Sequence, residues 1–188
     1  VGINIGYGFG SGVVQDGTLF GGVGELAGAV GALFPKGLPR PTTRDLMITL
    51  QSCGRAVEVV EDLDQFCAEQ DPVVAAWVER VSGQLSPLIS TVWLLLGPEE
   101  IVLTGHLPRH VSQAIAERLV HVLRTWPTGT SMPIPRILPA RLGRLSIAAG
   151  AAWLPILREG STNELDEAAS GRPADAGPPH ARASVTKV

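Results

Sequence analysis

"INIGYGFGSG", residues 3–12, decides the fold of this chain, because four glycines alternate with other residues after a short β-branched run. Alternate residues of a β-strand face the same side, so the four glycines leave one strand face without side chains. The dipeptide at Asp16 and Gly17 is typical of a two-residue hairpin turn. The sequence therefore predicts a hairpin in which "SGVVQ" is followed, after this turn, by the strand "TLF".

Two common glycine motifs do not explain the alternation. A dinucleotide-binding GxGxxG requires a helix after it, whereas a hairpin follows here. A Walker loop requires Lys followed by Ser or Thr, and the first lysine of the chain is Lys36. Two explanations remain open from the residues alone. Another segment packs on the bare face, or the bare backbone lets its N–H groups bind a phosphate.

Length and composition fit one compact domain, or one lobe of a larger protein. The chain has 188 residues, 45% of them hydrophobic, and a net charge of −3, so it lacks the basic surface typical of nucleic-acid binding. No signal peptide and no membrane span are visible, and a cytoplasmic location is the expectation. Because the chain begins at Val1 and enters a strand pattern at once, we expect residues upstream of it.

Cysteine and histidine give no sign of a metal site. Cys53 and Cys67 form no CxxC pair, and we expect both to be buried, reduced thiols. His106 and His110 are four residues apart, which suits one face of a helix, but no third ligand accompanies them. The sequence therefore predicts no metal ligands.

The rest of the chain alternates helices with short strands. Helices are predicted over 44–52, 60–69, 71–95, 107–124 and 142–157, and strands over 101–103 and 134–140. Thr42 or Thr43 caps the first helix and Asp71 caps the third. Prolines restrict the last strand to an edge of the sheet. From Glu159 onward large apolar residues almost vanish, which predicts a disordered tail over 159–188.

Three stretches, taken in order, resemble the ROK family (repressors, open reading frames and sugar kinases), which belongs to the actin/hexokinase-like superfamily of ATP-binding folds. "IGYGFGSGVVQDGTLFGG" is similar to the family's second phosphate-contacting hairpin. "GPEEIVLTGHLP" is similar to its adenosine-side motif, and "LGRLSIAAGAAWL" to its C-terminal helix. The resemblance covers residues 1–158. It implies an α/β fold of the ribonuclease H-like type, namely the C-terminal lobe with a mixed β-sheet and flanking helices.

The resemblance also assigns candidate ligand contacts. It implies nucleotide binding by Thr104 and Gly105, with ATP and Mg²⁺ as ligands if the protein is a kinase; no other cofactor is implied. The residues to which it assigns phosphate binding are Gly6, Gly8, Gly10, Ser11 and Gly12.

Several departures from the family pattern concern catalysis and sugar binding. The family's first phosphate hairpin and its general-base Asp lie upstream of the matching region, so no catalytic residue is assigned here. The family's sugar-contacting Glu falls on Ala29 and its sugar- and zinc-contacting His on Ala32. Its zinc loop is replaced by "FPKGLPRPTTRDL". Glu25 is a weak substitute for the sugar contact, and Thr104 and His106 flank Gly105 where the family has glycines.

These losses favour a transcriptional regulator over an enzyme. On that hypothesis the chain is the sugar-sensing and dimerising lobe of a ROK regulator. Its partners are a small-molecule sugar, a second copy of the chain, and DNA contacted only through a helix-turn-helix outside this sequence. The alternative is the C-terminal lobe of an ATP-dependent ROK sugar kinase, of the glucokinase or N-acetylhexosamine kinase type. A truncated product without activity is the third hypothesis, and in every case the isolated chain is not expected to be a kinase.

Overall fold

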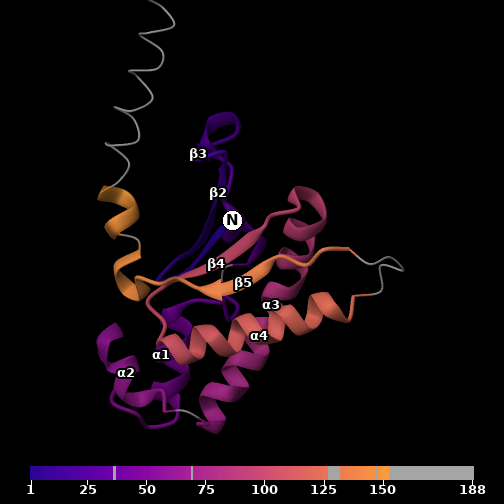
Figure 1. Cartoon of the computed structure of the whole chain (residues 1–188). Helices are drawn as coiled ribbons and strands as arrows, with labels where there is room; N and C mark the ends of the chain where they lie inside the picture. The colour runs from indigo at the N-terminus through magenta and orange to yellow at the C-terminus, as the bar shows by residue number, and fades with distance from the viewer. Residues whose placement is uncertain (36, 69, 127–131, 147, 153–188) are drawn as a thin grey trace, which may run out of the picture. The chain divides into compact units, whose positions relative to one another are not determined.

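A computed structural model describes residues 1–35, 37–68, 70–126, 132–146 and 148–152 (Figure 1). The chain divides into two units, residues 1–149 and residues 150–188. In the second unit the described residues, 150–152, are helical. The tail predicted over 159–188 lies outside the described residues.

Five strands form one mixed sheet within the described part of the chain. Their order across the sheet is β3-β2-β1-β4-β5. The first three are antiparallel neighbours, whereas β1, β4 and β5 run parallel. Strand β1 therefore joins an antiparallel half to a parallel half, and the mixed α/β sheet expected from the sequence is confirmed. The strands are β1 (Gly2–Ile5), β2 (Phe9–Gln15), β3 (Thr18–Phe20), β4 (Glu100–Gly105) and β5 (Arg136–Pro139).

Local chemistry explains two features of the sheet that the sequence predicts. The turn between β2 and β3 has positive φ at both Asp16 (52°) and Gly17 (76°), the conformation that an Asp-Gly hairpin turn requires. The proline-containing strand β5 lies at the edge, where a residue without an N–H costs no ladder hydrogen bond. Both predictions are confirmed.

In the described residues, four α-helices and three 3₁₀ turns lie between strands, and a fourth 3₁₀ turn and a further helical segment follow the last strand. The helices are α1 (Thr43–Ser52), α2 (Leu63–Phe66), α3 (Pro72–Leu96) and α4 (Arg109–Arg124). The 3₁₀ turns are η1 (Val23–Glu25), η2 (Val30–Leu33), η3 (Val60–Asp62) and η4 (Gly143–Leu145). None of the helices in the described ranges is long and apolar enough to span a lipid bilayer.

The predicted caps are in place, but one predicted helix is shorter than expected. Thr42 Oγ1 accepts a hydrogen bond from the Asp45 amide at 3.2 Å, and Asp71 Oδ1 accepts from the amides of Val73 and Val74, so both helices begin at side-chain caps. The helix predicted over 60–69 consists only of η3 and α2, because the backbone leaves the helical region at Cys67 (ψ 72°). Of the helix predicted over 142–157, residues 146 and 148–152 are helical, and the residues after 152 lie outside the described part.

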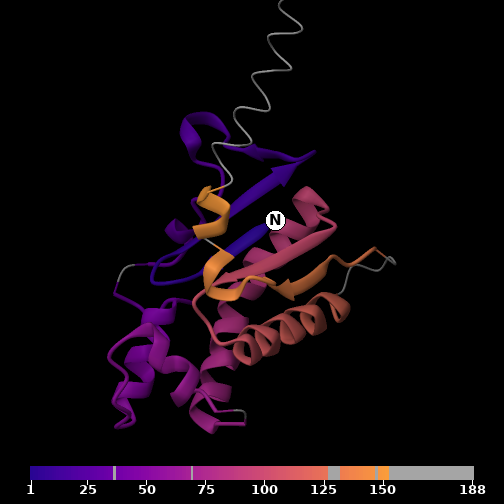
Figure 2. The same cartoon turned by 60° about the vertical axis from the view of Figure 1, so that its left-hand side comes forward.

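The hydrophobic core lies between one face of the sheet and the helices. Ile3 and Ile5 of β1 and Ile101 of β4 are fully buried, while the alternating residues Asn4 and Val102 face the other side and are half-buried. Helices α3 and α4 lie side by side (Figures 1 and 2). The largest fully buried side chains that the helices add to the core are Leu46, Leu50, Leu63, Trp77, Leu85, Ile89, Ile115, Leu119 and Leu123.

The start of α1 is fastened to the end of β1. The fully buried Thr43 donates from Oγ1 to the Ile5 carbonyl at 3.0 Å and from its amide to the Gly6 carbonyl at 2.9 Å. A backbone carbonyl buried without a partner costs free energy, so these two bonds fix where the chain turns after β1.

The two cysteines differ in environment. Cys67 is buried directly after α2, and burial raises the pKa of its thiol to about 11. Cys53 is exposed at the C-terminal cap of α1. The expectation of two buried thiols is therefore correct for Cys67 and wrong for Cys53, because α1 ends at the surface.

We predict that one thiol per native chain reacts rapidly with Ellman's reagent at pH 8 and that the second reacts only in denaturant. The reactive species is the thiolate, and the raised pKa of Cys67 keeps that thiol protonated at this pH. The variant Cys53→Ser should lose the rapid phase completely. Equal, rapid reaction of both thiols in the native chain would contradict this assignment.

Candidate functional site

The carboxyl ends of the three parallel strands lie together at one end of the sheet, the carboxyl edge, which is distinct from the lateral edge formed by β5. The loops that follow β1, β4 and β5 therefore lie along this edge, and α1 and α4 begin there. In open α/β sheets, ligands bind outside the carboxyl ends of the strands, where connections leave in opposite directions. Strands β1 and β4 form such a point, because the chain leaves β1 toward β2 on one side and leaves β4 toward β5 on the other.

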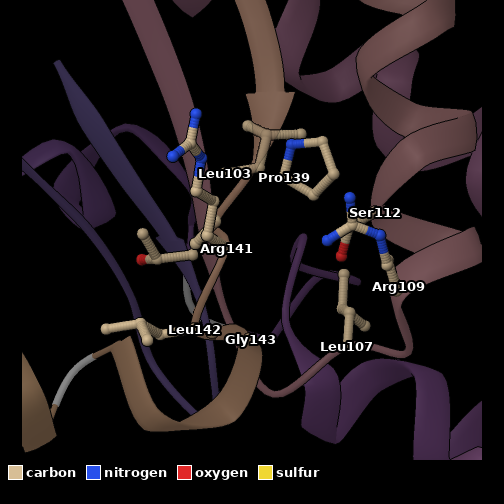
Figure 3. Close-up of a pocket in the computed structure, with 11 residues that line it drawn as sticks. Leu103, Leu107, Arg109, Ser112, Pro139, Arg141, Leu142 and Gly143 are labelled. Atoms are coloured by element: carbon tan, nitrogen blue, oxygen red, sulfur yellow. The ribbon is translucent and has the colours of Figure 1, made fainter.

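A cavity of about 210 Å³ opens at this edge between β4, β5 and the start of α4. Thr104 and Gly105 line it from β4, and Arg109 and Ser112 line it from α4. Figure 3 shows Arg109 and Arg141 on opposite sides of the cavity. The structure thus brings the two predicted nucleotide-binding residues, Thr104 and Gly105, into the wall of a cavity.

The mouth of this cavity is positively charged. Arg109 and Arg141 are exposed, and neither forms an ion pair with a carboxylate in the described ranges. Helix α4 has no acidic residue in its first turn and no side-chain cap, so its positive end also faces this region. Among the residues that the structure describes, no carboxylate lines the cavity. The arrangement therefore favours an anionic ligand.

Packing alone requires a glycine at position 105. Its φ is 120°, and a Cβ at this position would lie 2.2 Å from the carbonyl oxygen of Ile5. Neighbouring Thr104 donates from Oγ1 to the Ile3 carbonyl at 3.4 Å. The glycine therefore lets β4 approach the end of β1, and nucleotide binding by these two residues stays a prediction.

The turn between β1 and β2 has an open backbone. The amide of Gly6 donates to the Gly8 carbonyl at 3.0 Å, whereas the amides of Tyr7 and Gly8 have no hydrogen-bond partner in the part of the chain that the structure describes. Tyr7 is 61% exposed, and a Cβ at Gly8 would meet no atom within 4 Å. Two backbone donors are thus available to an anion at this turn.

The amides further along the glycine alternation are used within the protein. Ser11 donates from its amide to the Gly28 carbonyl at 2.9 Å, away from β1. Because antiparallel neighbours alternate between bonded and non-bonded pairs, Gly10 and Gly12 are then the residues bonded to β1, opposite Asn4 and Gly2. Of the five residues predicted to bind phosphate, Gly8 alone keeps an open amide within the described part of the chain, and phosphate binding itself stays a prediction.

The segment that packs on β2 also depends on glycine. A Cβ at Gly28 (φ 89°) would lie 2.0 Å from the Ser11 carbonyl oxygen, and one at Gly31 would lie 2.6 Å from that of Phe9. By contrast, a Cβ at Gly10 or Gly12 would have only ordinary contacts. A segment does pack on β2, but its tightest backbone contacts are at its own Gly28 and Gly31, not at the alternating glycines. The phosphate-binding explanation of the alternation stays a prediction.

The residues considered for sugar binding lie on this covering segment. Ala29 precedes η2 and Ala32 lies within it, and both are exposed. Glu25 lies in η1, and the structure does not describe its side chain. In the described residues, His, Cys, Asp and Glu form no group of three that could hold a metal ion. Sugar binding through Glu25 stays a prediction.

Sequence reasoning missed four polar residues near this edge. Arg109, Ser112 and Arg141 line the cavity, but no motif marked them, because they meet only through the strand order. Asn4 has a buried Oδ1 without a hydrogen-bond partner in the described part of the chain, next to Gly6. The one sequence signal for Asn4 was its position as a polar residue between the apolar residues Ile3 and Ile5.

Comparisons with known proteins extend these observations. No protein-family model matches the chain. It is 30% identical over 156 residues to an uncharacterized protein of Sinorhizobium fredii, y4fQ, a match that covers 83% of this chain and 40% of that protein.

Solved structures with the same fold include three ROK proteins. A ROK family protein of Streptococcus pneumoniae in complex with sucrose matches with a TM-score of 0.62 and 18% identity, covering 84% of this chain and 58% of that one. A ROK family glucokinase of Streptomyces griseus in complex with glucose and AMPPNP matches with a TM-score of 0.58 and 16% identity, covering 77% of this chain and 56% of that one. The ROK hexokinase of Thermus thermophilus matches with a TM-score of 0.54 and 22% identity, covering 77% of this chain and 52% of that one.

These matches show the fold. The chain has the actin/hexokinase-like fold of ROK proteins, as the sequence resemblance implies. It spans between half and three fifths of the length of these structures and two fifths of the Sinorhizobium protein.

We predict that Gly28→Ala destabilises the chain more than Gly37→Ala. Both glycines have nearly the same φ (89° and 88°), so both variants incur the same left-handed strain, but only Gly28 faces backbone within 4 Å. The clash should lower the free energy of unfolding by about 1–3 kcal/mol beyond the loss at Gly37. Urea unfolding of the two variants measures the difference, and equal losses would show that the segment does not press on β2.

Proposed function

We propose that the chain is the nucleotide-binding C-terminal lobe of a ROK-type sugar kinase. The observation that carries this proposal is one sheet edge with two anion-attracting openings, the Tyr7–Gly8 turn and the cavity beside Gly105. Strands β2 and β4 lie two strand spacings apart, about 10 Å. A nucleoside triphosphate is long enough to place its nucleoside at the cavity and its phosphates at the turn.

The residues would divide the binding as follows. Backbone amides of Tyr7 and Gly8 donate to phosphate oxygens, and the Arg109 and Arg141 guanidinium groups attract the anion to the edge. Mg²⁺ would arrive with the nucleotide and be held by its phosphates, because no described residue brings a carboxylate to the cavity and the turn has none. The bound AMPPNP in the Streptomyces glucokinase, which has the same fold, supports a nucleotide as the ligand.

Phosphoryl transfer would require residues outside this chain. It needs phosphate contacts on both sides of the nucleotide and a group that accepts the proton of the sugar hydroxyl. The residues present supply one phosphate cradle and no general base in the family's position. We therefore propose that this chain binds nucleotide and that the catalytic base lies on a separate lobe.

A transcriptional regulator is the second candidate function, and one observation favours it. Ala29 and Ala32 present exposed methyl groups where the resemblance places sugar-contacting Glu and His, and methyl groups cannot hydrogen-bond sugar hydroxyls. Such a lobe would sense a sugar or a nucleotide without phosphorylating it, while a DNA-binding segment elsewhere contacts the operator. Turnover of glucose or N-acetylhexosamines by the full-length protein at about 1 s⁻¹ or faster would support the kinase, and ligand-dependent DNA binding without turnover would support the regulator.

We predict that Arg109→Gln and Arg141→Gln each weaken the binding of ADP about tenfold, because each removes a charge-assisted contact. Arg124→Gln is the matched control, since Arg124 is exposed at the far end of α4. Isothermal titration calorimetry with ADP measures the dissociation constants. Loss of affinity in the Arg124 variant of the same size, or no binding of ADP to the chain, would contradict the site.

A second pair of variants tests the turn. We predict that Gly8→Pro reduces the preference for ADP over adenosine, because proline has no N–H to donate. Gly8→Ala keeps the amide and places its methyl group in open space, so it should bind ADP as the original chain does. Circular dichroism verifies that both variants are folded, and unchanged ADP affinity in a folded Gly8→Pro variant would exclude the turn as a phosphate site.

A further inference from the structure

The charged side chains of the carboxyl edge lie at the cavity and not at the turn. Arg109 and Arg141 stand on opposite sides of the cavity (Figure 3), and neither forms an ion pair with a carboxylate of the described residues. The turn after β1 offers only the uncharged backbone amides of Tyr7 and Gly8. A nucleotide with its phosphates at the turn would place its uncharged nucleoside between the two arginines. Their charges would then have no partner in the ligand.

The position of Arg109 is not explained by the stability of α4. Arg109 is the first residue of this helix, where the helix dipole favours acidic side chains and disfavours basic ones. The first turn of α4 contains no acidic residue, and its amides receive no side-chain cap. The guanidinium group and the open end of the helix therefore both add positive potential at the cavity. This combination is suited to a bound anion.

A buried hydroxyl group lines the same cavity. Ser112 lies three residues after Arg109, on the same side of α4, and is 9% exposed. Its amide donates to the Pro108 carbonyl at 3.1 Å, but its Oγ makes no hydrogen bond within the described ranges. Buried hydroxyl groups are normally bonded. The free hydroxyl is thus a second, independent indication of a polar ligand atom beside Arg109.

The cavity can enclose only part of a ligand. Its volume of about 210 Å³ is below the roughly 300 Å³ at which ligand pockets usually begin. The apolar side chains of Leu103, Leu107 and Pro139 contribute to its wall, which suits the faces of a nucleobase. With the base inside, the ribose lies at the mouth, where the exposed arginines are.

We propose that the carboxyl edge binds a nucleotide that carries a phosphate on its ribose 2′ or 3′ oxygen in addition to its 5′ phosphate. This inference rests on the nucleotide binding proposed for the chain and specifies the class of nucleotide. The 5′ phosphate accepts hydrogen bonds from the amides of Tyr7 and Gly8. The ribose phosphate binds between Arg109 and Arg141, whose guanidinium groups can each donate two parallel bonds to phosphate, and Ser112 Oγ donates to it.

A different use of the two arginines would be to stack on the faces of the base. In that arrangement a ribose phosphate would add no affinity. Stacking leaves the hydroxyl of Ser112 without a role, because a base face accepts no strong hydrogen bond. A phosphate accounts for both guanidinium groups and for the hydroxyl, so the phosphate is the arrangement that the residues favour.

Isothermal titration calorimetry of the chain with four ligands tests the inference. The ligands are AMP, ADP, adenosine 2′,5′-bisphosphate and adenosine 3′,5′-bisphosphate. Each bisphosphate differs from AMP only by the ribose phosphate. We expect at least one of them to bind about tenfold more tightly than AMP, because charge-assisted hydrogen bonds are added. ADP reports separately on the proposed nucleotide site.

The ratio of the AMP and bisphosphate dissociation constants isolates the second phosphate in variants. Arg141→Gln and Ser112→Ala should each lower this ratio severalfold. Arg124→Gln is the control for charge, since Arg124 is exposed at the far end of α4. Ser82→Ala is the control for the hydroxyl, because Ser82 is also a buried helical serine whose Oγ has no partner among the described residues, and it does not line this cavity. Both controls should keep the ratio of the original chain.

The outcomes separate this inference from the proposed function. Binding of ADP without any gain from a ribose phosphate would overturn the inference and leave the nucleotide site standing. No binding of any of the four ligands would overturn both. Equal losses in the Ser112 and Ser82 variants would remove the hydroxyl from the site. Displacement of the bisphosphate by inorganic phosphate at the same concentration would show a site for free anions and would also overturn the inference.

Discussion

The carbonyl group of Ile5 is the point on which the two halves of the sheet depend. It accepts a hydrogen bond from the Thr43 hydroxyl at 3.0 Å and a longer one from the His106 amide at 3.4 Å. Gly105 approaches it so closely that no side chain fits between them. One atom at the end of β1 therefore fixes the start of α1 and the end of β4. The open turn lies next to this atom in sequence, and the cavity lies next to it in space.

The sequence predicted those features that depend on neighbouring residues. The Asp16–Gly17 turn, the caps at Thr42 and Asp71 and the edge position of β5 all follow from the conformations and hydrogen bonds available to a few adjacent residues. Cys53 was wrongly expected to be buried, because its exposure depends on where α1 ends relative to the rest of the surface.

The site could be predicted only in part for the same reason. Thr104 and Gly105 were identified through a family resemblance and do line the cavity. Arg109 begins α4 and Arg141 follows β5, and both line the cavity only because β4 and β5 are neighbours in the sheet. No local pattern marks such a pair. The glycine alternation was informative about its turn, but the closest backbone contacts are at Gly28 and Gly31, whose role depends on a segment folding back over β2.

The order of the strands also constrains how this chain reaches its native state. Thr104 and Ile3 are hydrogen-bonded although 101 residues separate them, and contacts of such long range form slowly, because closing a large loop is entropically unfavourable. The local hairpins of β1, β2 and β3 need no such closure and can form first. Until β4 arrives, Ile3 and Ile5 remain uncovered on a strand with an unpaired edge, which is the kind of surface that aggregates. The central strand of the finished sheet is thus the part of the chain most open to aggregation before the long-range contacts form.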